Sequence, residues 1–312
     1  MERLTDNKIV LIKRKTRLED LIVRYNTISQ AQFYIEHLGS DFSDYVKEDE
    51  QYKKSVTIAC RELETVGRVH VVDREFLPNF IFGDHDVVVA VGQDGLVANT
   101  LKYLTNQPLI GVNPDPSRWD GVLLPFQASD LRLVMQDVFR GERKIRKVSM
   151  ARASLHDGQS IYGVNDLFIG QKTHVSSRYQ IQLGSVKEFQ SSSGIIISTG
   201  LGSTGWMKSI VTGAARITSG ISNTPLQVPT QKQTSWDMNY LYYSVREPFP
   251  SRTSQTNLVF GKITQENPLK VLSQMPENGV IFSDGMESDY LEFNSGMEAI
   301  ISIAEKKGHL VV

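Results

Sequence analysis

A strand-like run that ends in a turn with an aspartate offers the first candidate for chemistry. Val87–Val91 is apolar, Gly92-Gln93-Asp94-Gly95 follows it, and a helix-like stretch begins at Leu96. In an open α/β sheet this order places a carboxylate and backbone N–H groups at the carboxyl edge, where ligands bind. Glycines let a phosphate or sugar approach the backbone. Asp94 is therefore suited to accept a hydroxyl proton or to hold a cation against phosphate, unless it only caps a helix.

A second turn of glycines and hydroxyls follows another apolar strand. Gly194–Ser198 is the strand, and the turn after it consists of Thr199, Gly200, Leu201, Gly202, Ser203, Thr204, Gly205 and Trp206. Small residues let a flat ligand lie against the backbone, and Ser203 and Thr204 offer hydroxyl donors. Alternatively, Ser203 is only the N-cap of the helix that follows. Two such turns in separate domains predict a ligand cleft between them.

Three smaller groups of polar residues each have a functional and a purely structural interpretation. Asn165 and Asp166 place an amide beside a carboxylate at the end of a strand, which is also a common turn. Asp284-Gly285 is a standard hairpin dipeptide. The basic run Lys13–Arg17 could neutralise phosphates or form a solvated face. The six histidines show no ligand spacing, so we assign no residue to a metal.

The elements that must position these residues form a clear pattern in the first half of the chain. Strand-like runs alternate there with helix-like stretches, the strands at Ile9–Ile12, Arg68–Val72, Asp86–Val91 and Leu109–Val112 and the helices at Leu18–Leu38, Lys54–Val66 and Leu96–Leu104. A charged loop is expected at Asp41–Glu50. Val-rich strands that alternate with helices favour a parallel sheet covered on both faces. We therefore expect a doubly wound α/β domain over residues 1–146.

The second half has shorter strands separated by Gly, Asn, Asp and Ser. They lie at Ser160–Val164, Arg178–Leu183, Gly194–Ser198, Tyr240–Val245, Asn257–Ile263, Gly279–Ser283 and Glu298–Ala304. One helix is expected at Ser203–Ile217, and a loop at Ser219–Ser235. This rhythm is typical of an antiparallel β-sandwich, which we expect over residues 147–312. The boundary is placed in the basic stretch 141–147.

Composition excludes several classes of protein. The 312 residues carry 34 Lys or Arg and 35 Asp or Glu, a net charge of -1 that is too balanced for coating DNA or an anionic membrane. No run approaches the roughly 18 apolar residues of a membrane span. Ile9 begins the first apolar segment too early for a cleavable signal. With a single cysteine, Cys60, the sequence predicts a cytoplasmic protein that binds neither nucleic acid nor membrane.

Taken in order, the polar turns resemble the NAD kinase family. The family hallmark is Gly-Gly-Asp-Gly after a strand, then an Asn-Glu or Asn-Asp pair, then a Ser-Thr-x-x-Gly-Ser-Thr-like turn. The chain has these at Gly92–Gly95, Asn165-Asp166 and Ser198–Gly205. Further likeness to the mitochondrial type comes from Thr16-Arg17, Gly111–Pro116, Ser176–Arg178, Ser192–Gly194 and Ser244–Pro248. The resemblance covers nearly the whole chain.

The resemblance implies a kinase that moves the γ-phosphoryl of ATP to the 2′-hydroxyl of the adenosine ribose of NAD, giving NADP. Asp94 matches the residue that activates this hydroxyl, with Mg2+ screening the phosphates. Asn165 and Asp166 match the pair that holds NAD, and Asp284 an aspartate near ATP and the ribose. The other binding residues implied by position are Gly92, Gly95, Thr199, Ser203, Thr204, Gly205, Trp206 and, at the donor phosphates, Arg17. The family habit of pairing through the sandwich domain implies a homodimer.

One departure from the family pattern leaves rival functions open. Gln93 stands where the hallmark has its second glycine. If this position needs a positive φ, a side chain costs about 1 kcal/mol, and a phosphate lying against it would add a steric cost. One alternative is therefore a NAD-binding homologue with impaired transfer. A lipid kinase-like enzyme is a second alternative, because such enzymes share the Gly-Gly-Asp-Gly theme.

Overall fold

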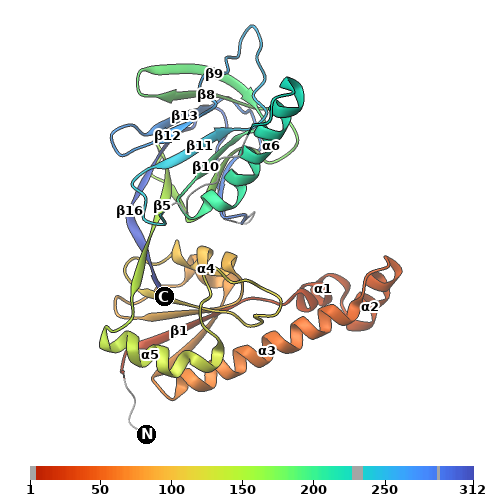
Figure 1. Cartoon of the computed structure of the whole chain (residues 1–312), viewed down its shortest axis with the longest axis vertical. Helices are drawn as coiled ribbons and strands as arrows, with labels where there is room; N and C mark the ends of the chain where they lie inside the picture. Colours follow the sequence, from red (N-terminus) through yellow and green to blue (C-terminus); the bar gives the residue numbers. More distant parts are fainter. Residues whose placement is uncertain (1–4, 227–234, 287–288) are drawn as a thin grey trace. The chain divides into compact units, whose positions relative to one another are not determined.

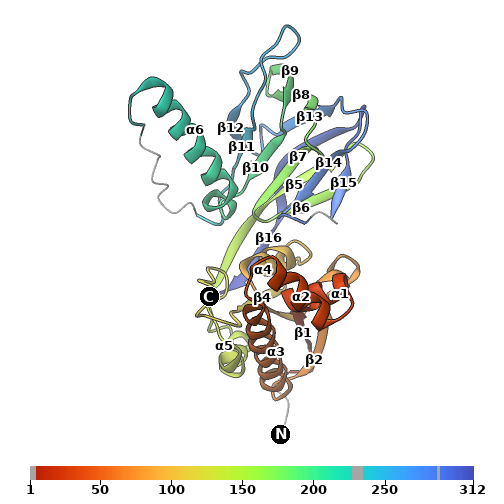
Figure 2. The same cartoon turned by 90° about the vertical axis from the view of Figure 1, so that its right-hand side faces the viewer.

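The computed structural model describes residues 5–226, 235–286 and 289–312, which divide into two compact units. The first unit comprises the chain up to Arg146 together with Gly308–Val312, and the second comprises Lys147–Lys307. Figures 1 and 2 label the helices and strands of both units. The last five residues therefore pack with the beginning of the chain.

A parallel sheet forms the centre of the first unit. Its strands are β2 (Arg68–Asp73), β1 (Lys8–Lys13), β3 (Val87–Val91), β4 (Pro108–Val112) and the end of β16 (Glu298–Val311), in that order. Every residue of β3 is buried, as expected of a sheet covered on both faces. Helices α3 (Phe42–Glu64) and α5 (Leu131–Arg140) cover one face, and α4 (Asp94–Leu101) covers the other (Figure 1). A short 3-10 turn precedes α5 at Ala128–Asp130, and another follows β2 at Arg74–Asn79.

Two antiparallel sheets share one core in the second unit. The first sheet contains β9 (Val186–Ser192), β8 (Ser177–Leu183), β13 (Leu269–Ser273), β16, β5 (Ile145–Leu155) and β6 (Ser160–Gly163). The second has the order β12 (Phe260–Ile263), β11 (Leu241–Val245), β10 (Ile195–Ser198), β7 (Asp166–Gln171), β14 (Gly279–Ser283) and β15 (Tyr290–Glu292). Tyr179 and Val271 from the first sheet pack with Ile197 and Tyr243 from the second. The predicted fold class, α/β followed by an antiparallel sandwich, is confirmed.

Helix α6 (Trp206–Ser222) covers the outer face of the second sheet, where Met207 packs against Phe168, Ile196 and Val280 (Figure 2). The helix continues beyond its expected end at Ile217, so the loop predicted at 219–235 begins as helix. Residues 227–234 of that predicted loop lie outside the described part of the chain. The sequence patterns did not predict β5, β7, β9, β13 and β15.

The long helix expected at Leu18–Leu38 is two helices, α1 (Arg17–Tyr25) and α2 (Ile28–His37). Asn26 adopts φ 67°, which a right-handed helix cannot contain. Thr27 then caps α2, because its hydroxyl accepts the Gln30 N–H at 3.1 Å. An asparagine followed by a threonine was thus the overlooked signal for the break.

The charged loop expected at Asp41–Glu50 is the beginning of α3. The Asp41 carboxylate accepts the Ser43 N–H at 2.8 Å and caps the helix. Glu48 and Asp49, which suggested a solvated loop, are only 4% and 7% exposed. Both have partners in the interior, so their charge does not require solvent.

Truncation of Leu11 tests how strongly the first unit depends on its sheet. Leu11 is fully buried in β1 and lies in register with Val71 of β2, which is 43% exposed. We expect Leu11→Ala to lower the free energy of unfolding by about 2 to 5 kcal/mol, because it leaves a cavity. The matched Val71→Ala variant should lose under about 1 kcal/mol. Urea unfolding followed by circular dichroism measures the free energy of unfolding of both variants. Equal losses would contradict the placement of Leu11 in the core and of Val71 at the surface.

Candidate functional site

Asp94 begins helix α4 at the carboxyl end of β3. Its Oδ1 accepts the Leu123 N–H at 2.8 Å and its Oδ2 accepts the Val122 N–H at 3.2 Å. The side chain therefore does not cap its own helix, whose N-cap is Gln93. A carboxylate has about four lone-pair directions, so Asp94 retains the capacity to accept a further donor such as a hydroxyl. Two fixed backbone donors orient a half-buried carboxylate that still has acceptor capacity.

The loop after β4 supplies those donors and was missed as part of the site. A Cβ on Gly111 would lie 2.0 Å from the Leu123 carbonyl oxygen, so only glycine permits this approach. Asn113 braces the loop, since its amide donates to the Trp119 carbonyl at 2.9 Å and accepts the Asp115 N–H at 3.1 Å. The Asn113-Pro114-Asp115 sequence is typical of such turns and could have identified the loop.

The turn Gly92–Gly95 carries no backbone strain. Gln93 adopts φ −105° and ψ 165°, an extended conformation open to any residue. The cost considered for a positive φ at this position therefore does not arise. Gly95 is exposed, and a Cβ there would meet nothing within 4 Å. The fold itself does not require glycine at position 95. Because Gly95 has no side chain, the start of α4 is accessible.

The basic run after β1 is paired with carboxylates of the same unit. The pairs are Lys13–Asp73 at 2.9 Å, Arg14–Glu48 at 2.6 Å, Lys15–Glu75 at 3.2 Å and Arg17–Asp44 at 2.7 Å. Asp44 also binds Arg118, and the two guanidinium groups, Arg118 foremost, hold the pKa of this carboxyl well below its usual range. The contact of Arg17 with donor phosphates stays a prediction, and a phosphate there would compete with Asp44.

In the second unit, Asp284 anchors the Asn165-Asp166 turn, which lies between β6 and β7. Its carboxylate accepts the N–H groups of Val164 at 3.0 Å, Asn165 at 2.6 Å and Asp166 at 3.2 Å. Asp284 and Gly285 have φ values of 54° and 68°, so the turn predicted at this dipeptide is confirmed. A contact of Asp284 with ATP or the ribose stays a prediction. The structure gives its carboxylate a backbone-holding role that the sequence did not indicate.

The turn after β10 is joined to the Asn165-Asp166 turn. The Thr199 N–H donates to the Asn165 carbonyl at 3.0 Å, and its hydroxyl donates to the Val164 carbonyl at 2.6 Å. A Cβ on Gly202 would lie 2.1 Å from the Asn165 carbonyl oxygen, so this close approach requires glycine. Ser203 is buried and donates to the Gly200 carbonyl at 2.7 Å; it is not the N-cap of α6, which is Gly205. These contacts make the two turns one rigid assembly.

Several side chains on this assembly remain available. The Asn165 side-chain amide forms no hydrogen bond with any described residue, although its backbone N–H and carbonyl are both bound. Thr204 and Gly205 are exposed. The half-buried Trp206 stacks on Phe168 with ring centroids 6.1 Å apart. The Asn165 amide is thus unused by the described residues, whereas the Thr204 hydroxyl already donates to the Leu201 carbonyl at 3.4 Å and retains only its capacity to accept.

Asp166 is the most perturbed acid of this assembly. Its Oδ1 is buried and has no hydrogen-bond partner among the described residues. Burial raises the pKa of Asp166 to about 7, the negative charge of Asp284 adds to this, and the Ser198 hydroxyl opposes it. A perturbed carboxyl beside an unused amide is typical of functional sites. Near neutral pH this group exchanges between a hydrogen-bond acceptor and a donor.

The candidate residues therefore form two groups, one in each unit. Asp94, Gly92 and Gly95 lie in the first, and the turns around Asn165 and Thr199 lie in the second. The cleft predicted between them stays a prediction. Among the described residues, no three His, Cys, Asp or Glu side chains gather as metal ligands. None of the described helices is both long enough and apolar enough to cross a membrane.

The raised pKa of Asp166 predicts a pH-dependent stability. Above its ordinary pKa of 3.8 the unfolded chain ionises this group, whereas the folded chain keeps the proton until about pH 7. Its contribution to stability therefore falls as the pH rises through this window. We expect Asp166→Asn, which carries no such charge, to gain stability over the parent between pH 4 and pH 7 and to keep a constant advantage above it. Thermal unfolding across pH measures this, and a constant difference throughout would contradict it.

No protein-family model matches the chain. A NAD kinase of Clostridium kluyveri is 30% identical over 130 residues, which are 39% of this chain and 44% of that protein. The matched part thus spans less than half of the Clostridium relative. The human protein named NAD kinase 2, mitochondrial, is 25% identical over 364 aligned positions, covering 95% of this chain and 82% of its own.

Two solved structures share the fold. One is an NAD kinase from Archaeoglobus fulgidus in complex with ATP, with a TM-score of 0.57 and 15% identity over 98% of this chain and 93% of that chain. The other is yeast NADH kinase complexed with NADH, with a TM-score of 0.56 and 13% identity over 99% of this chain and 84% of that chain. In sequence and in fold, the chain therefore resembles NAD kinases, the mitochondrial type included, as its ordered motifs indicated.

Proposed function

We propose that the chain is an ATP-dependent NAD kinase that transfers the γ-phosphoryl group to the 2′-hydroxyl of the adenosine ribose of NAD and produces NADP. The observation that carries this proposal is the Asp94 carboxylate, which two backbone N–H groups orient while acceptor capacity remains. The likeness to NAD kinases over 95% of the chain supports it. The relatives with bound ATP and NADH support the classes of donor and acceptor.

Asp94 would act as the proton acceptor for the attacking hydroxyl. Phosphoryl transfer requires little covalent help, so correct placement and charge stabilisation provide most of the rate. The bonds from Val122 and Leu123 restrict the rotation of the Asp94 side chain and so reduce the ordering needed at the moment of reaction. The first N–H groups of α4, next to the exposed Gly95, favour a phosphate nearby. Mg2+ bound with ATP would screen the phosphate charges.

Asn165 and Asp166 would hold NAD by hydrogen bonds. The Asn165 amide offers both a donor and an acceptor, and no described residue uses either. The buried Oδ1 of the half-buried Asp166 has no partner among the described residues, and a ligand hydroxyl or amine that reached it would supply one. The anchoring by Asp284 and Thr199 holds both residues before NAD arrives, which lowers the entropic cost of binding.

Replacement of Asp94 tests the proposal directly. We expect Asp94→Asn to lower kcat by about 100-fold or more, because a neutral amide cannot accept the hydroxyl proton. The affinity for NAD should change less than about threefold, since an asparagine can still hydrogen-bond the hydroxyl and the other proposed NAD contacts lie at Asn165 and Asp166. The chain is incubated with NAD, ATP and Mg2+, and NADP is measured with an NADP-specific dehydrogenase. Asp120→Asn, an exposed aspartate of the loop after β4, serves as the control. Absence of NADP formation above the Asp94→Asn level would remove the proposal.

Gln93→Gly separates an active kinase from a homologue in which Gln93 impairs transfer. Because Gln93 is extended, its removal relieves no backbone strain. We expect the rate of NADP formation to change less than about threefold, and glycine to lower stability by about 0.5 kcal/mol because it makes the unfolded chain more flexible. A rise of tenfold or more in the rate would instead favour the impaired homologue. Calorimetric titration with ATP, in parent and variant, shows whether donor binding is the step that changes.

The remaining expectations rest on the resemblance. A homodimer would give about twice the chain mass in light scattering after gel filtration. The human relative is named as mitochondrial, so the cytoplasmic location stays a prediction. The lipid kinase-like alternative is tested in the same assay by replacing NAD with a lipid alcohol, and phosphorylation of the lipid alone would favour it.

A further inference from the structure

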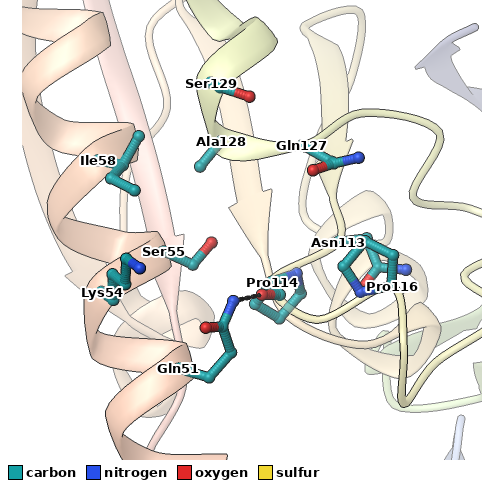
Figure 3. A pocket seen from close by; sticks show the side chains of 10 residues that line it. All are labelled: Gln51, Lys54, Ser55, Ile58, Asn113, Pro114, Pro116, Gln127, Ala128 and Ser129. Carbon is teal, nitrogen blue, oxygen red and sulfur yellow. Dashed lines mark hydrogen bonds between the residues drawn. The ribbon is translucent and has the colours of Figure 1, made fainter.

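A small polar cavity lies in the first unit between α3 and the segments that follow β4 (Figure 3). Its volume is about 110 Å3. At about 30 Å3 for each water in the liquid, this space suits three or four waters or one small polar molecule. Its polar lining comes from Gln51, Lys54 and Ser55 on α3 and from Asn113, Gln127 and Ser129 on the opposite side. Of these six residues, only Asn113 was described above, as the residue that braces the loop next to Asp94.

Ser55 provides the observation that points to a ligand. Its side chain is only 5% exposed, and its hydroxyl forms no hydrogen bond with any described residue. Figure 3 shows this hydroxyl leaving α3 and pointing into the space before Gln127 and Ala128. Most buried hydroxyls have a partner, because water is lost on burial. A hydroxyl that faces this partly open pocket without a partner among the described residues is therefore available to donate to a molecule held there.

The charges around the cavity favour an anion. Lys54 pairs with no carboxylate in the described chain, whereas its neighbour Lys53 pairs with Asp49 and Glu19. The lining contains no Asp or Glu. Three acids adjoin lining residues in sequence: Asp130 accepts the Gln127 N–H at 2.9 Å, Asp115 pairs with Arg118 at 3.6 Å, and Glu50 is exposed to solvent. An exposed ammonium group and a buried hydroxyl, neither of them bonded to another described residue, thus line a small space whose own lining carries no carboxylate.

We propose that this cavity binds a small tetrahedral oxyanion, with inorganic phosphate as its simplest form. Lys54 neutralises the charge of the anion, and the Ser55 hydroxyl donates a hydrogen bond to one of its oxygens. The Gln51 amide already donates to the Pro114 carbonyl at 2.9 Å and fixes the adjoining wall. Binding of an anion here does not require that the chain carry out the proposed phosphoryl transfer.

The position of the cavity connects it to the loop that orients Asp94. Asn113 and Gln127 border the cavity, and Val122 and Leu123, the donors to Asp94, lie between them in sequence. A bound anion links α3 to both ends of this loop. We therefore expect phosphate to slow hydrogen exchange of the backbone amides in residues 113–127.

Calorimetric titration of the full chain with inorganic phosphate tests the proposal. We expect saturable binding that Lys54→Gln weakens about tenfold and Ser55→Ala about fivefold, as for loss of a charged and a neutral hydrogen bond. Lys47→Gln, which changes an exposed lysine of the same helix, should bind like the parent. Asp94→Asn should also bind like the parent, which distinguishes this cavity from the candidate catalytic turn.

Three outcomes would overturn the proposal, and two of them concern the binding of phosphate itself. One is the absence of saturable binding to a chain whose circular dichroism shows it folded. The other is binding that Lys54→Gln and Ser55→Ala leave intact. Titration with acetate tests the shape of the ligand, and acetate that binds as tightly as phosphate would contradict a tetrahedral oxyanion.

Discussion

Both groups of candidate residues, one in each unit, depend on a carboxylate that accepts consecutive backbone N–H groups. Asp284 does so for the turn at Val164–Asp166, and Asp94 does so for Val122 and Leu123. A backbone N–H that loses water must find another partner, and an ionised acceptor provides a strong one. The two aspartates therefore fix the turns, and the side chains on these turns need not serve the fold. The unused amide of Asn165 is a direct result.

This arrangement also explains the perturbed acid. Asp166 follows the anchored turn directly, so the charge that holds its N–H also lies near its carboxyl group. Burial disfavours a second negative charge there, and the pKa of Asp166 is raised to about 7. Burial, reinforced by the charge of Asp284 that stabilises the backbone, thus keeps the Asp166 carboxyl protonated over part of the physiological range. A turn built in this way offers a ligand both proton donors and acceptors.

Local patterns predicted the strands of the parallel sheet well, because β3 is apolar along its whole length and β1 is apolar between its two terminal lysines. They failed at α3, where Glu48 and Asp49 suggested a solvated loop. The partners of these acids, Arg14 and Thr16, lie more than thirty positions earlier in the chain. A pattern of neighbours carries no information about such distant pairs, so composition alone could not show that the charges are buried. The break after Tyr25, in contrast, had a local cause in Asn26 and Thr27.

The sequence by itself determined the succession of strands and helices and the order of the polar turns, since both follow from local residue preferences. It identified Asp94, Asn165 and Asp166 as candidates for chemistry. Tertiary structure alone decided that Asp284 holds a backbone turn, that Gln93 is unstrained and that Ser55 faces a cavity. Each of these facts depends on contacts between segments far apart in the chain. Hydrogen-bond partners and empty space are set by packing, whereas helix and strand preferences are set by neighbours.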